Sequence, residues 1–444
     1  MAQKLLIIGG VAAGMSAAAK ARRVDPELEI TVYTDDEYIS YAGCGLPYFI
    51  GGRFTEKASL IARTAEEFAA QKIIVKTGIR AEEIKADTKT IVLKDLKNDQ
   101  VFSDQYDRLI IAAGARPFVP PMDGSELKGV FTLRTIHDSL NIKDYLHHQK
   151  PVKAAVIGGG YIGLEMAESL LEQGCEVSII ERAPHIIPNM DEDMALIVTD
   201  YLQSKGVKVY TDTAVAGFSG EQRVTMVNTD KGPIEADFVL LSIGVLPNGE
   251  IAARAGIELG IRGAIRVNDR METNIKDIFA AGDCATTRHL ISGEEVYIPM
   301  GTTANKQGKA AGENAAGGQA SFKGVLGTGI ARVIEMEISR TGLSERECRQ
   351  LGIDYIAKKI KANSAAHYCP ASGEIHIKLI ADRRDKRLIG AQIVGLQGSA
   401  MRIDMLASAI TMQATVEDLI DMDLAYSPPF SPVWDPVLVA LNQF

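Results

Sequence analysis

The sequence has 444 residues, of which 46% are hydrophobic and 24% are charged, and it carries a formal net charge of −9 at pH 7. Because this length exceeds what one hydrophobic core usually serves, we expect two to four domains. The acidic balance argues against nucleic acid as the main partner, and no apolar run is long enough to span a membrane.

The N-terminal region is expected to form a βαβ unit. Residues 1–10 lead into a buried strand over residues 4–8 rather than a signal peptide, which favours a cytoplasmic protein. A helix of small residues over 11–23 and a strand over 29–33 follow, an order that predicts a dinucleotide site at the helix N-terminus. The motif is imperfect, because Val11 occupies its middle glycine position and no acid directly follows the second strand. Its candidate ligands are Gly9, Gly10, Ala13, Gly14, Thr34 and Asp35.

A glycine-rich segment with one cysteine comes next, Ser40-Tyr41-Ala42-Gly43-Cys44-Gly45-Leu46-Pro47-Tyr48. Since it closely follows the first nucleotide unit, we expect Cys44 to lie near the bound nucleotide. A second cysteine five residues on would make a redox dithiol, but that position is Phe49. Cys44 is therefore either a lone redox thiol or a structural one. We interpret the remaining cysteines, none of which forms a C-x-x-C pair or a metal site, as structural: Cys175, Cys284, Cys348 and Cys369.

A second and complete nucleotide motif begins near residue 152. A strand over 152–157 runs into Gly-Gly-Gly-Tyr-Ile-Gly, followed by a helix over 164–173 and a strand over 177–180. Glu181 would bond the ribose of NADH and repel the 2′-phosphate of NADPH, whereas Arg182 could contact that phosphate. NADH is favoured, and NADPH use stays open. The candidate ligands are Gly158, Gly160, Tyr161, Ile162, Gly163, Glu181 and Arg182.

Three further strands end in glycine turns, over residues 106–115, 236–244 and 273–285. This order of segments resembles the two-dinucleotide flavoprotein disulfide reductase family. The resemblance implies an α/β fold with two Rossmann-like dinucleotide-binding domains, for FAD and NAD, plus a C-terminal α+β dimerisation domain. In that family the first unit binds FAD and the second binds the nicotinamide nucleotide. Further cofactor ligands implied are Ala113, Gly114, Gly244, Gly282 and Asp283, the last contacting the ribityl chain of the flavin.

The implied domain boundaries are residues 1–118 and 239–321 for the FAD domain, 119–238 for the NAD(P) domain and 322–444 for the dimerisation domain. In the last domain we expect strands over 375–381 and 388–394 and an amphipathic helix over 402–412. Four prolines within residues 427–436 exclude a helix or a central strand there. The family implies a homodimer with an active site shared between subunits.

Because it lacks the second cysteine, the sequence resembles the single-cysteine branch of this family. That branch holds coenzyme A disulfide reductases, persulfide or polysulfide reductases, and NADH oxidases and peroxidases. The oxidases and peroxidases usually carry a histidine in the first glycine turn, where this chain has Val11, Ala12 and Ala13. Persulfide reductases commonly append a rhodanese domain, and this sequence stops at Phe444. We therefore expect a coenzyme A disulfide reductase, with persulfide reduction as the alternative and an NADH oxidase behind both.

The resemblance also implies roles for single residues. Cys44 would form a resting mixed disulfide with coenzyme A, and Tyr368 and Tyr426 of the partner subunit would donate or orient protons at the sulfur. His367 is the less favoured acid. The coenzyme A tunnel would be lined by Ser16, Lys20, Arg23, Ser40 and Lys72, with Asn305 as a further candidate. These cations could equally be a solvated helix end that complements the helix dipole.

Overall fold

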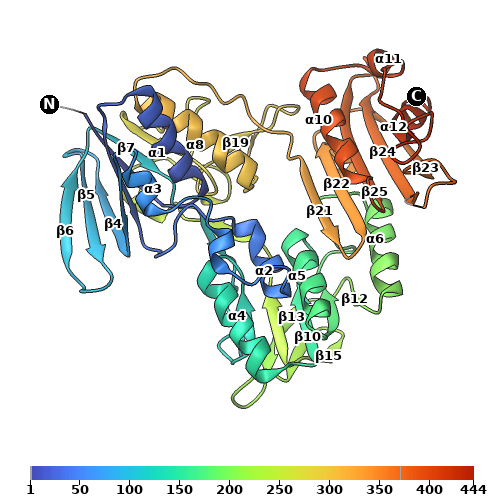
Figure 1. Cartoon of the computed structure of the whole chain (residues 1–444), viewed down its shortest axis with the longest axis horizontal. Helices are drawn as coiled ribbons and strands as arrows, with labels where there is room; N and C mark the ends of the chain where they lie inside the picture. The colour runs from blue at the N-terminus through green and yellow to red at the C-terminus, as the bar shows by residue number, and fades with distance from the viewer. Residues whose placement is uncertain (1–2, 371) are drawn as a thin grey trace.

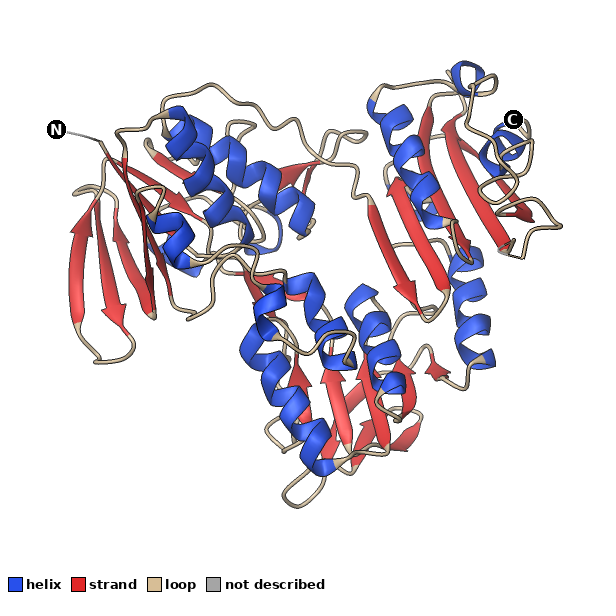
Figure 2. Cartoon of the chain, in the orientation of Figure 1, coloured by secondary structure: helices blue, strands red, loops and turns tan. Residues whose placement is uncertain are grey.

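The computed structural model describes residues 3–370 and 372–444. Figure 1 shows three units: one coloured blue to yellow, a green one below it, and an orange to red one that holds the C-terminus. Figure 2 shows that each of them contains both helices and β-strands. Among the described residues, no helix is long and apolar enough to cross a membrane.

The first unit contains a five-stranded parallel sheet in the order β18-β7-β1-β2-β3. The edge strand β18 comes from much later in the chain than the other four. The strands are β1 (Lys4–Ile8), β2 (Glu29–Thr34), β3 (Ile73–Thr77), β7 (Arg108–Ile111) and β18 (Ile278–Ala280). An antiparallel sheet packs on one face through a shared apolar cluster, and consists of β4 (Ile79–Lys85), β5 (Thr90–Asp95) and β6 (Val101–Gln105).

Two helices cover the other face, α1 (Ala12–Val24) and α8 (Gly301–Ala315), and they lie unusually close to each other. A Cβ on Gly308 would lie 2.3 Å from the carbonyl oxygen of Ala13, and a Cβ on Gly312 would lie 2.2 Å from that of Ala17. Glycine is therefore required where the helices cross. The helix that follows the turn at Asp283 along the chain, α8, begins only at Gly301. The hairpin of β19 (Thr287–Arg288) and β20 (Glu295–Val296) intervenes.

The second unit is a parallel sheet in the order β12-β11-β10-β16-β9. Its strands are β9 (Val130–Thr132), β10 (Lys153–Ile157), β11 (Glu176–Ile180), β12 (Lys208–Tyr210) and β16 (Phe238–Leu241). The helices are α4 (Ile136–Gln149), α5 (Tyr161–Glu172) and α6 (Glu192–Ser204), and an antiparallel sheet is formed by β13 (Val215–Ser219), β14 (Met226–Thr229) and β15 (Gly232–Glu235).

The predicted boundary between residues 238 and 239 is wrong, because it cuts through β16. That strand pairs with β10 and β9 in the second sheet. The chain returns to the first unit only after it, through β17 (Val245–Pro247), which pairs with β8 (Ala115–Pro117). The remaining short elements of the two units are η1 (Gly43–Gly45), α2 (Leu46–Gly51), η2 (Lys57–Leu60), α3 (Ala65–Ala69), α7 (Glu250–Arg254) and η3 (Ile261–Gly263).

The C-terminal unit is an antiparallel sheet in the order β21-β22-β25-β24-β23. Its strands are β21 (Gly329–Val333), β22 (Met336–Gly342), β23 (Tyr355–Asn363), β24 (Glu374–Asp382) and β25 (Leu388–Gly395), and its helices are α9 (Glu345–Gln350), η4 (Ala400–Arg402), α10 (Ile403–Thr411), α11 (Val416–Leu419) and α12 (Pro436–Leu441). Both expected strands and the expected helix are present. The proline-rich stretch is a loop except at its end, because Pro436 is the first residue of α12, where a missing N–H costs nothing.

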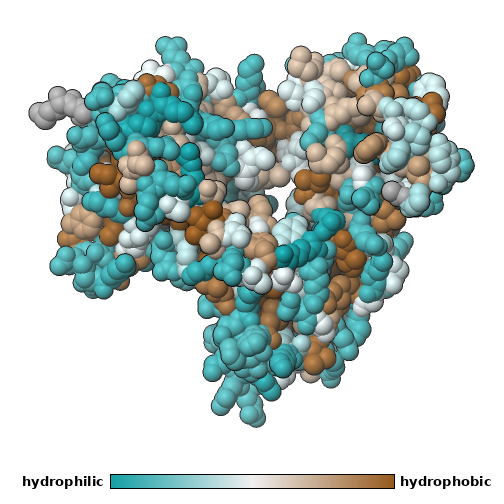
Figure 3. All heavy atoms as spheres, in the orientation of Figure 1, coloured by the Kyte–Doolittle hydropathy of each residue, from teal (hydrophilic) through white to brown (hydrophobic). Residues whose placement is uncertain are grey.

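Buried charges hold the C-terminal unit to the second unit. The ammonium of Lys378 on β24 is only 6% exposed and lies 2.6 Å from the carboxylate of Asp193 and 3.3 Å from that of Asp191, at the start of α6. It also pairs with Glu345 on α9. A cleft of about 1600 Å³ opens between α8 and α10, and Figure 3 shows a hollow on the same side, between the first and C-terminal units.

Candidate functional site

The first glycine turn is shaped for close approach of a ligand. Gly9 has φ +106°, and a Cβ there would lie 2.1 Å from the carbonyl oxygen of Ala112, while a Cβ on Gly14 would lie 1.9 Å from that of Gly9. No side chain caps α1 at Val11, so the first N–H groups of this helix point to the turn without a partner from its cap residue. This cradle fits a dinucleotide pyrophosphate.

The other candidate ligands of the first site gather at the same edge of the sheet, because β1, β7 and β18 run parallel and end together. The side chain of Thr34 is buried against Gly10, and Asp35 is exposed beside it. A Cβ on Gly282 would lie 2.7 Å from that of Ala13. Ala113 and Gly114, which has φ +65°, follow β7.

Asp283 lies at this edge with a partner that the sequence did not predict. The guanidinium of Arg134, in the segment before α4, donates a hydrogen bond of 2.7 Å to its carboxylate. The hydroxyl of Tyr297 donates to the carbonyl oxygen of the same residue at 2.9 Å. Asp283 is therefore fixed in position between the first and second units, where it can accept a hydroxyl from the polar chain of a flavin.

The second glycine turn repeats this geometry. Gly158 has φ +102°, and a Cβ on Gly163 would lie 2.1 Å from the carbonyl oxygen of Gly158. A Cβ on Gly160 or on Gly244 would meet nothing within 4 Å, so both backbones face open space. No side chain caps the start of α5 either. A second dinucleotide fits here.

Three side chains at the second turn differ in what they do. The carboxylate of Glu181 accepts hydrogen bonds from the backbone N–H groups of Gly159 and Ala183, both at 2.8 Å. Arg182, between the two residues whose N–H groups and carboxylate form these bonds, is exposed. The ring of Tyr161 lies against Gly329 of β21, and its burial raises the pKa of the phenol. Its side chain therefore faces the C-terminal unit, and Ile162 beside it is 41% exposed.

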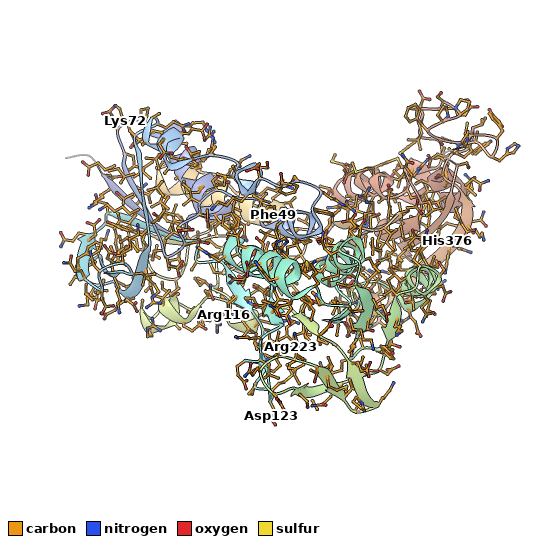
Figure 4. The ribbon with its side chains drawn as sticks, turned by 60° about the horizontal axis from the view of Figure 1, so that its bottom comes forward. Phe49, Lys72, Arg116, Asp123, Arg223 and His376 are labelled. Carbon is orange, nitrogen blue, oxygen red and sulfur yellow. The ribbon has the colours of Figure 1, made fainter. Side chains whose placement is uncertain are left out.

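Cys44 lies in η1, directly before α2, and α2 is held by the second unit. The hydroxyl of Ser169 on α5 donates to the carbonyl oxygen of Pro47 at 2.7 Å, and the ammonium of Lys143 on α4 donates to that of Phe49 at 2.8 Å. Phe49, labelled near the middle of the molecule in Figure 4, is only 2% exposed. The position of a second redox cysteine is thus filled by a buried ring.

The thiol of Cys44 is exposed, but atoms crowded around it remove part of its water. This partial burial raises the pKa of Cys44, the carboxylates of Glu165 and Asp283 raise it further, and Arg134 opposes them. A helix N-terminus directly after a thiol can lower its pKa. The helix is too short to do so, since α2 has six residues, and the protein groups around the thiol favour the protonated form.

The candidate coenzyme A residues follow α1 away from the cysteine. Ser40 lies beside the first turn, where its N–H donates to the carbonyl oxygen of Gly10. Ser16 on α1 donates a hydrogen bond of 2.6 Å to Asn305 on α8. Lys20, one turn further on, is ion-paired with Glu313 at 2.8 Å. Ser16 and Lys20 therefore contact α8 directly.

The last two candidate cations lie near the C-terminal end of α1. Arg23 is exposed at the end of α1, and the carbonyl oxygen of Lys72 accepts a hydrogen bond from Arg22 at 2.7 Å. Figure 4 places Lys72 at the outer end of the first unit, far from Phe49. Since α1 has 13 residues, the candidate residues along this helix are spread over roughly 20 Å.

Tyr368 and Tyr426 are brought together on the C-terminal unit, at 65% and 49% exposure. The partial loss of water and the adjacent Tyr426 raise the pKa of Tyr368. Further large apolar side chains are exposed close by in the chain: Phe430, Val433 and Trp434. Such an uncovered group of aromatic residues is typical of a protein interface.

The remaining candidates are structural or were missed. Cys175, Cys284 and Cys348 are buried, and Cys369 is half-buried. Over residues 3–370 and 372–444, no three His, Cys, Asp or Glu side chains gather as a metal site would require. Arg134 and Glu165 were not predicted as site residues. Glu165 could have been recognised from the sequence, because it lies four residues after Tyr161, one helical turn into the helix that follows the glycine motif. Arg134 follows no such motif.

Comparisons with known proteins agree with this architecture. The family model described as pyridine nucleotide-disulphide oxidoreductase matches residues 3–308, and the model of its dimerisation domain matches residues 330–436. Among solved structures, that of reduced Bacillus anthracis CoADR-RHD superposes with a TM-score of 0.97 at 36% identity, covering 100% of this chain and 80% of that one.

The named relatives differ in activity. A protein of Pyrococcus horikoshii named NAD(P)H coenzyme A polysulfide/persulfide reductase is 38% identical, over 99% of this chain and 98% of its own length. A Methanocaldococcus jannaschii protein named NADH oxidase is 37% identical, over 99% and 98%. A Staphylococcus haemolyticus coenzyme A disulfide reductase is 30% identical, over 97% and 96%.

Proposed function

Because the chain belongs to the pyridine nucleotide-disulphide oxidoreductase family, whose members use FAD and NAD(P)H, we propose that it reduces a sulfur–sulfur bond carried by coenzyme A. The observation that carries this proposal is the lone thiol of Cys44 beside the first glycine turn, with buried Phe49 where a second cysteine would stand. A lone thiol must find its disulfide partner on the substrate.

The glycine turns and Cys44 have different roles in the proposed reaction. The turns at Gly9 and Gly158 hold the two dinucleotides, and bound FAD supplies the transfer of two electrons from NAD(P)H to sulfur. The thiolate of Cys44 attacks one sulfur of coenzyme A disulfide, forms a mixed disulfide and expels one coenzyme A thiolate. Two electrons then break the mixed disulfide. The balance is CoA disulfide + NAD(P)H + H⁺ → 2 CoA thiol + NAD(P)⁺.

A departing thiolate needs a proton donor, and the chain's own phenols are the candidates. Tyr368 and Tyr426 lie side by side and exposed on the unit that matches the dimerisation domain. In a two-fold dimer, Tyr368 of the partner subunit and Tyr426 of the partner subunit would reach the coenzyme A sulfur above Cys44. The candidate residues from Ser16 to Lys72 would contact the nucleotide end of coenzyme A.

Coenzyme A persulfide is the second candidate acceptor, favoured by the 38% identity to the Pyrococcus horikoshii protein. That reaction also balances: CoA persulfide + NAD(P)H + H⁺ → CoA thiol + H₂S + NAD(P)⁺. An appended rhodanese domain is not a criterion for persulfide reduction here, because that relative is matched over 98% of its own length. The choice between the two acceptors therefore depends on turnover.

The test is the intact mass of the purified protein before and after treatment with a reductant. We expect an adduct of one coenzyme A, removed by the reductant, absent from Cys44→Ser and retained in Cys369→Ser, the matched control at the other accessible cysteine. Steady-state turnover with CoA disulfide and with CoA persulfide then ranks the acceptors. Cys44 found free or carrying only oxygen, with NADH oxidation driven by oxygen alone, would favour an oxidase instead.

A further inference from the structure

Cys44 lies between two stretches of chain that are bound to different units. Before the cysteine, the N–H of Ser40 donates to the carbonyl oxygen of Gly10 at 2.8 Å, which fixes this stretch to the first glycine turn. The cysteine itself is flanked by two glycines, and a Cβ on Gly43 would meet nothing within 4 Å. The position of the thiol therefore depends also on what holds the chain after it.

The helix after the cysteine, α2, is held by three side chains of the second unit, each of which donates a hydrogen bond to a different backbone carbonyl of α2. The pairs are Ser169 with Pro47 at 2.7 Å, Lys143 with Phe49 at 2.8 Å, and Gln173 with Gly51 at 2.9 Å. Two of these carbonyls belong to the last turn of α2, where a helix has no i+4 N–H group of its own to offer. The chain after the thiol is therefore fixed to α4 and α5.

Lys143 differs from the other two donors, because its ammonium also contacts an aromatic ring. Its Nζ atom lies 4.1 Å from the centre of the Phe49 ring, as a cation–π contact requires. In the described part of the chain no carboxylate forms an ion pair with this half-buried ammonium, and burial lowers the pKa of Lys143. Its interactions are thus directed to one residue, Phe49, through both the carbonyl group and the ring, and a hydrogen bond from a charged donor is stronger than a neutral one.

Phe49 stands where a redox dithiol would have its second cysteine. Its ring is buried in the same apolar cluster as Ile136 of α4 and Leu170 of α5. In a dithiol segment, a covalent bond would join positions 44 and 49 in the oxidised state only. Here the buried ring and the ammonium of Lys143 hold position 49 without a covalent bond, and so do this in every redox state of Cys44.

We propose that Lys143 is a positioning residue for the thiol, an inference that rests on the proposed function. Ser40 holds the chain on one side of Cys44, and Lys143, together with Ser169 and Gln173, holds it on the other. The step that depends on this placement is the one in which two electrons from NAD(P)H break the Cys44–CoA bond and leave two thiolates. Lys143 forms and breaks no covalent bond in it. A misplacement of about 1 Å can slow such a step roughly a hundredfold, whereas the passage of electrons from NAD(P)H to FAD does not involve this segment.

The test separates the two half-reactions of the FAD-loaded dimer by rapid mixing without oxygen. The first is the bleaching of the flavin by NADH, and the second is the return of flavin absorbance when the reduced protein is mixed with a disulfide. Two disulfides are used, CoA disulfide and dithiodipyridine, a small aryl disulfide that needs no coenzyme A site. A wrong choice of acceptor therefore affects only the first of them, and Cys44→Ser measures any reoxidation that bypasses the thiol.

The variants separate the charge of Lys143 from its hydrogen bond. Lys143→Met keeps the aliphatic stem and removes the ammonium, and Lys143→Gln keeps an N–H donor without the charge. Asp144→Asn is the matched control, because Asp144 is the next residue of α4, is exposed, and pairs with His148 on the same helix. Ser169→Ala removes one of the other bonds to α2 and serves if Lys143→Met does not retain FAD.

We expect Lys143→Met to slow reoxidation by dithiodipyridine about tenfold to a hundredfold, while bleaching by NADH and FAD content stay as in the wild type. Lys143→Gln and Ser169→Ala slow the same half-reaction by less, and Asp144→Asn leaves both unchanged. Wild-type reoxidation in Lys143→Met overturns the inference, and so does equal slowing of both half-reactions, which would make Lys143 a structural residue of the second unit. Reoxidation of Cys44→Ser at the wild-type rate would instead refute the proposed function, and the inference with it.

Discussion

The choice of nicotinamide coenzyme gives a prediction that the structure makes quantitative. Both oxygens of the Glu181 carboxylate are held by backbone N–H groups, one from Gly159 and one from Ala183, each at 2.8 Å. A carboxylate oxygen has two lone pairs, so each oxygen can still accept a ribose hydroxyl. We therefore expect the fixed carboxylate to accept the ribose hydroxyls of NADH without having to be ordered on binding, and to repel the 2′-phosphate of NADPH.

Glu181→Ala removes both effects. The loss of charged hydrogen bonds to the ribose costs NADH about 2 kcal/mol. Relief of repulsion, screened by solvent at this partly exposed site, favours NADPH by about 1 to 2 kcal/mol. The ratio of kcat/KM for NADPH over NADH is thus expected to rise roughly a hundredfold to a thousandfold.

The assay is steady-state oxidation of each coenzyme at saturating acceptor. Glu176→Ala, at the opposite end of β11 and exposed, is the control and leaves the ratio unchanged. In the Glu181→Ala background, Arg182→Ala lowers the use of NADPH, because the exposed guanidinium is the nearest phosphate partner in sequence. If Glu181→Ala lowered kcat/KM equally for NADH and NADPH, the reasoning would be refuted. Glu181 would then only stabilise the glycine turn through its hydrogen bonds to the backbone.

Three further outcomes follow from single contacts. Gly14→Ala places a Cβ about where the carbonyl of Gly9 lies, 1.9 Å away, so the protein loses its flavin absorbance while Ala19→Ser, later on the same helix, keeps it. Lys378→Met leaves Asp191 without its buried ammonium and lowers the stability to urea unfolding by about 3 kcal/mol. Arg402→Met breaks the 2.9 Å bond to Asp435 and loosens the 427–436 loop, so we expect turnover to fall more than FAD content. Unchanged turnover would show that this loop takes no part in the active site.

The glycine turns were predictable because their constraints are local. Gly14 must lack a Cβ since its neighbour five residues earlier occupies the space, and the same holds for Gly163 and Gly158. A pattern written within six residues can be recognised in a sequence. The order of strands and helices around each turn could be predicted for the same reason, and the family models match those segments.

Errors arose where a contact joins distant parts of the chain. The strand β16 shares its sheet with β10 from more than 80 positions earlier, so the order of segments along the chain did not show that this strand belongs to the second unit. The bond between Arg134 and Asp283 spans 149 positions. Neither residue carries a local signature of the other, because an ion pair across two domains is specified by how their sheets pack.

The cysteine segment shows why the site belongs to both nucleotide units. Cys44 follows the first glycine turn in sequence, yet the helix after it is fixed to α4 and α5 by Lys143 and Ser169. The helix α5 begins at the second glycine turn and, one turn later, presents Glu165 to Tyr48. One helix thus begins at the second glycine turn and also holds the segment that follows Cys44. A redox cysteine placed on the first unit alone would have no such connection.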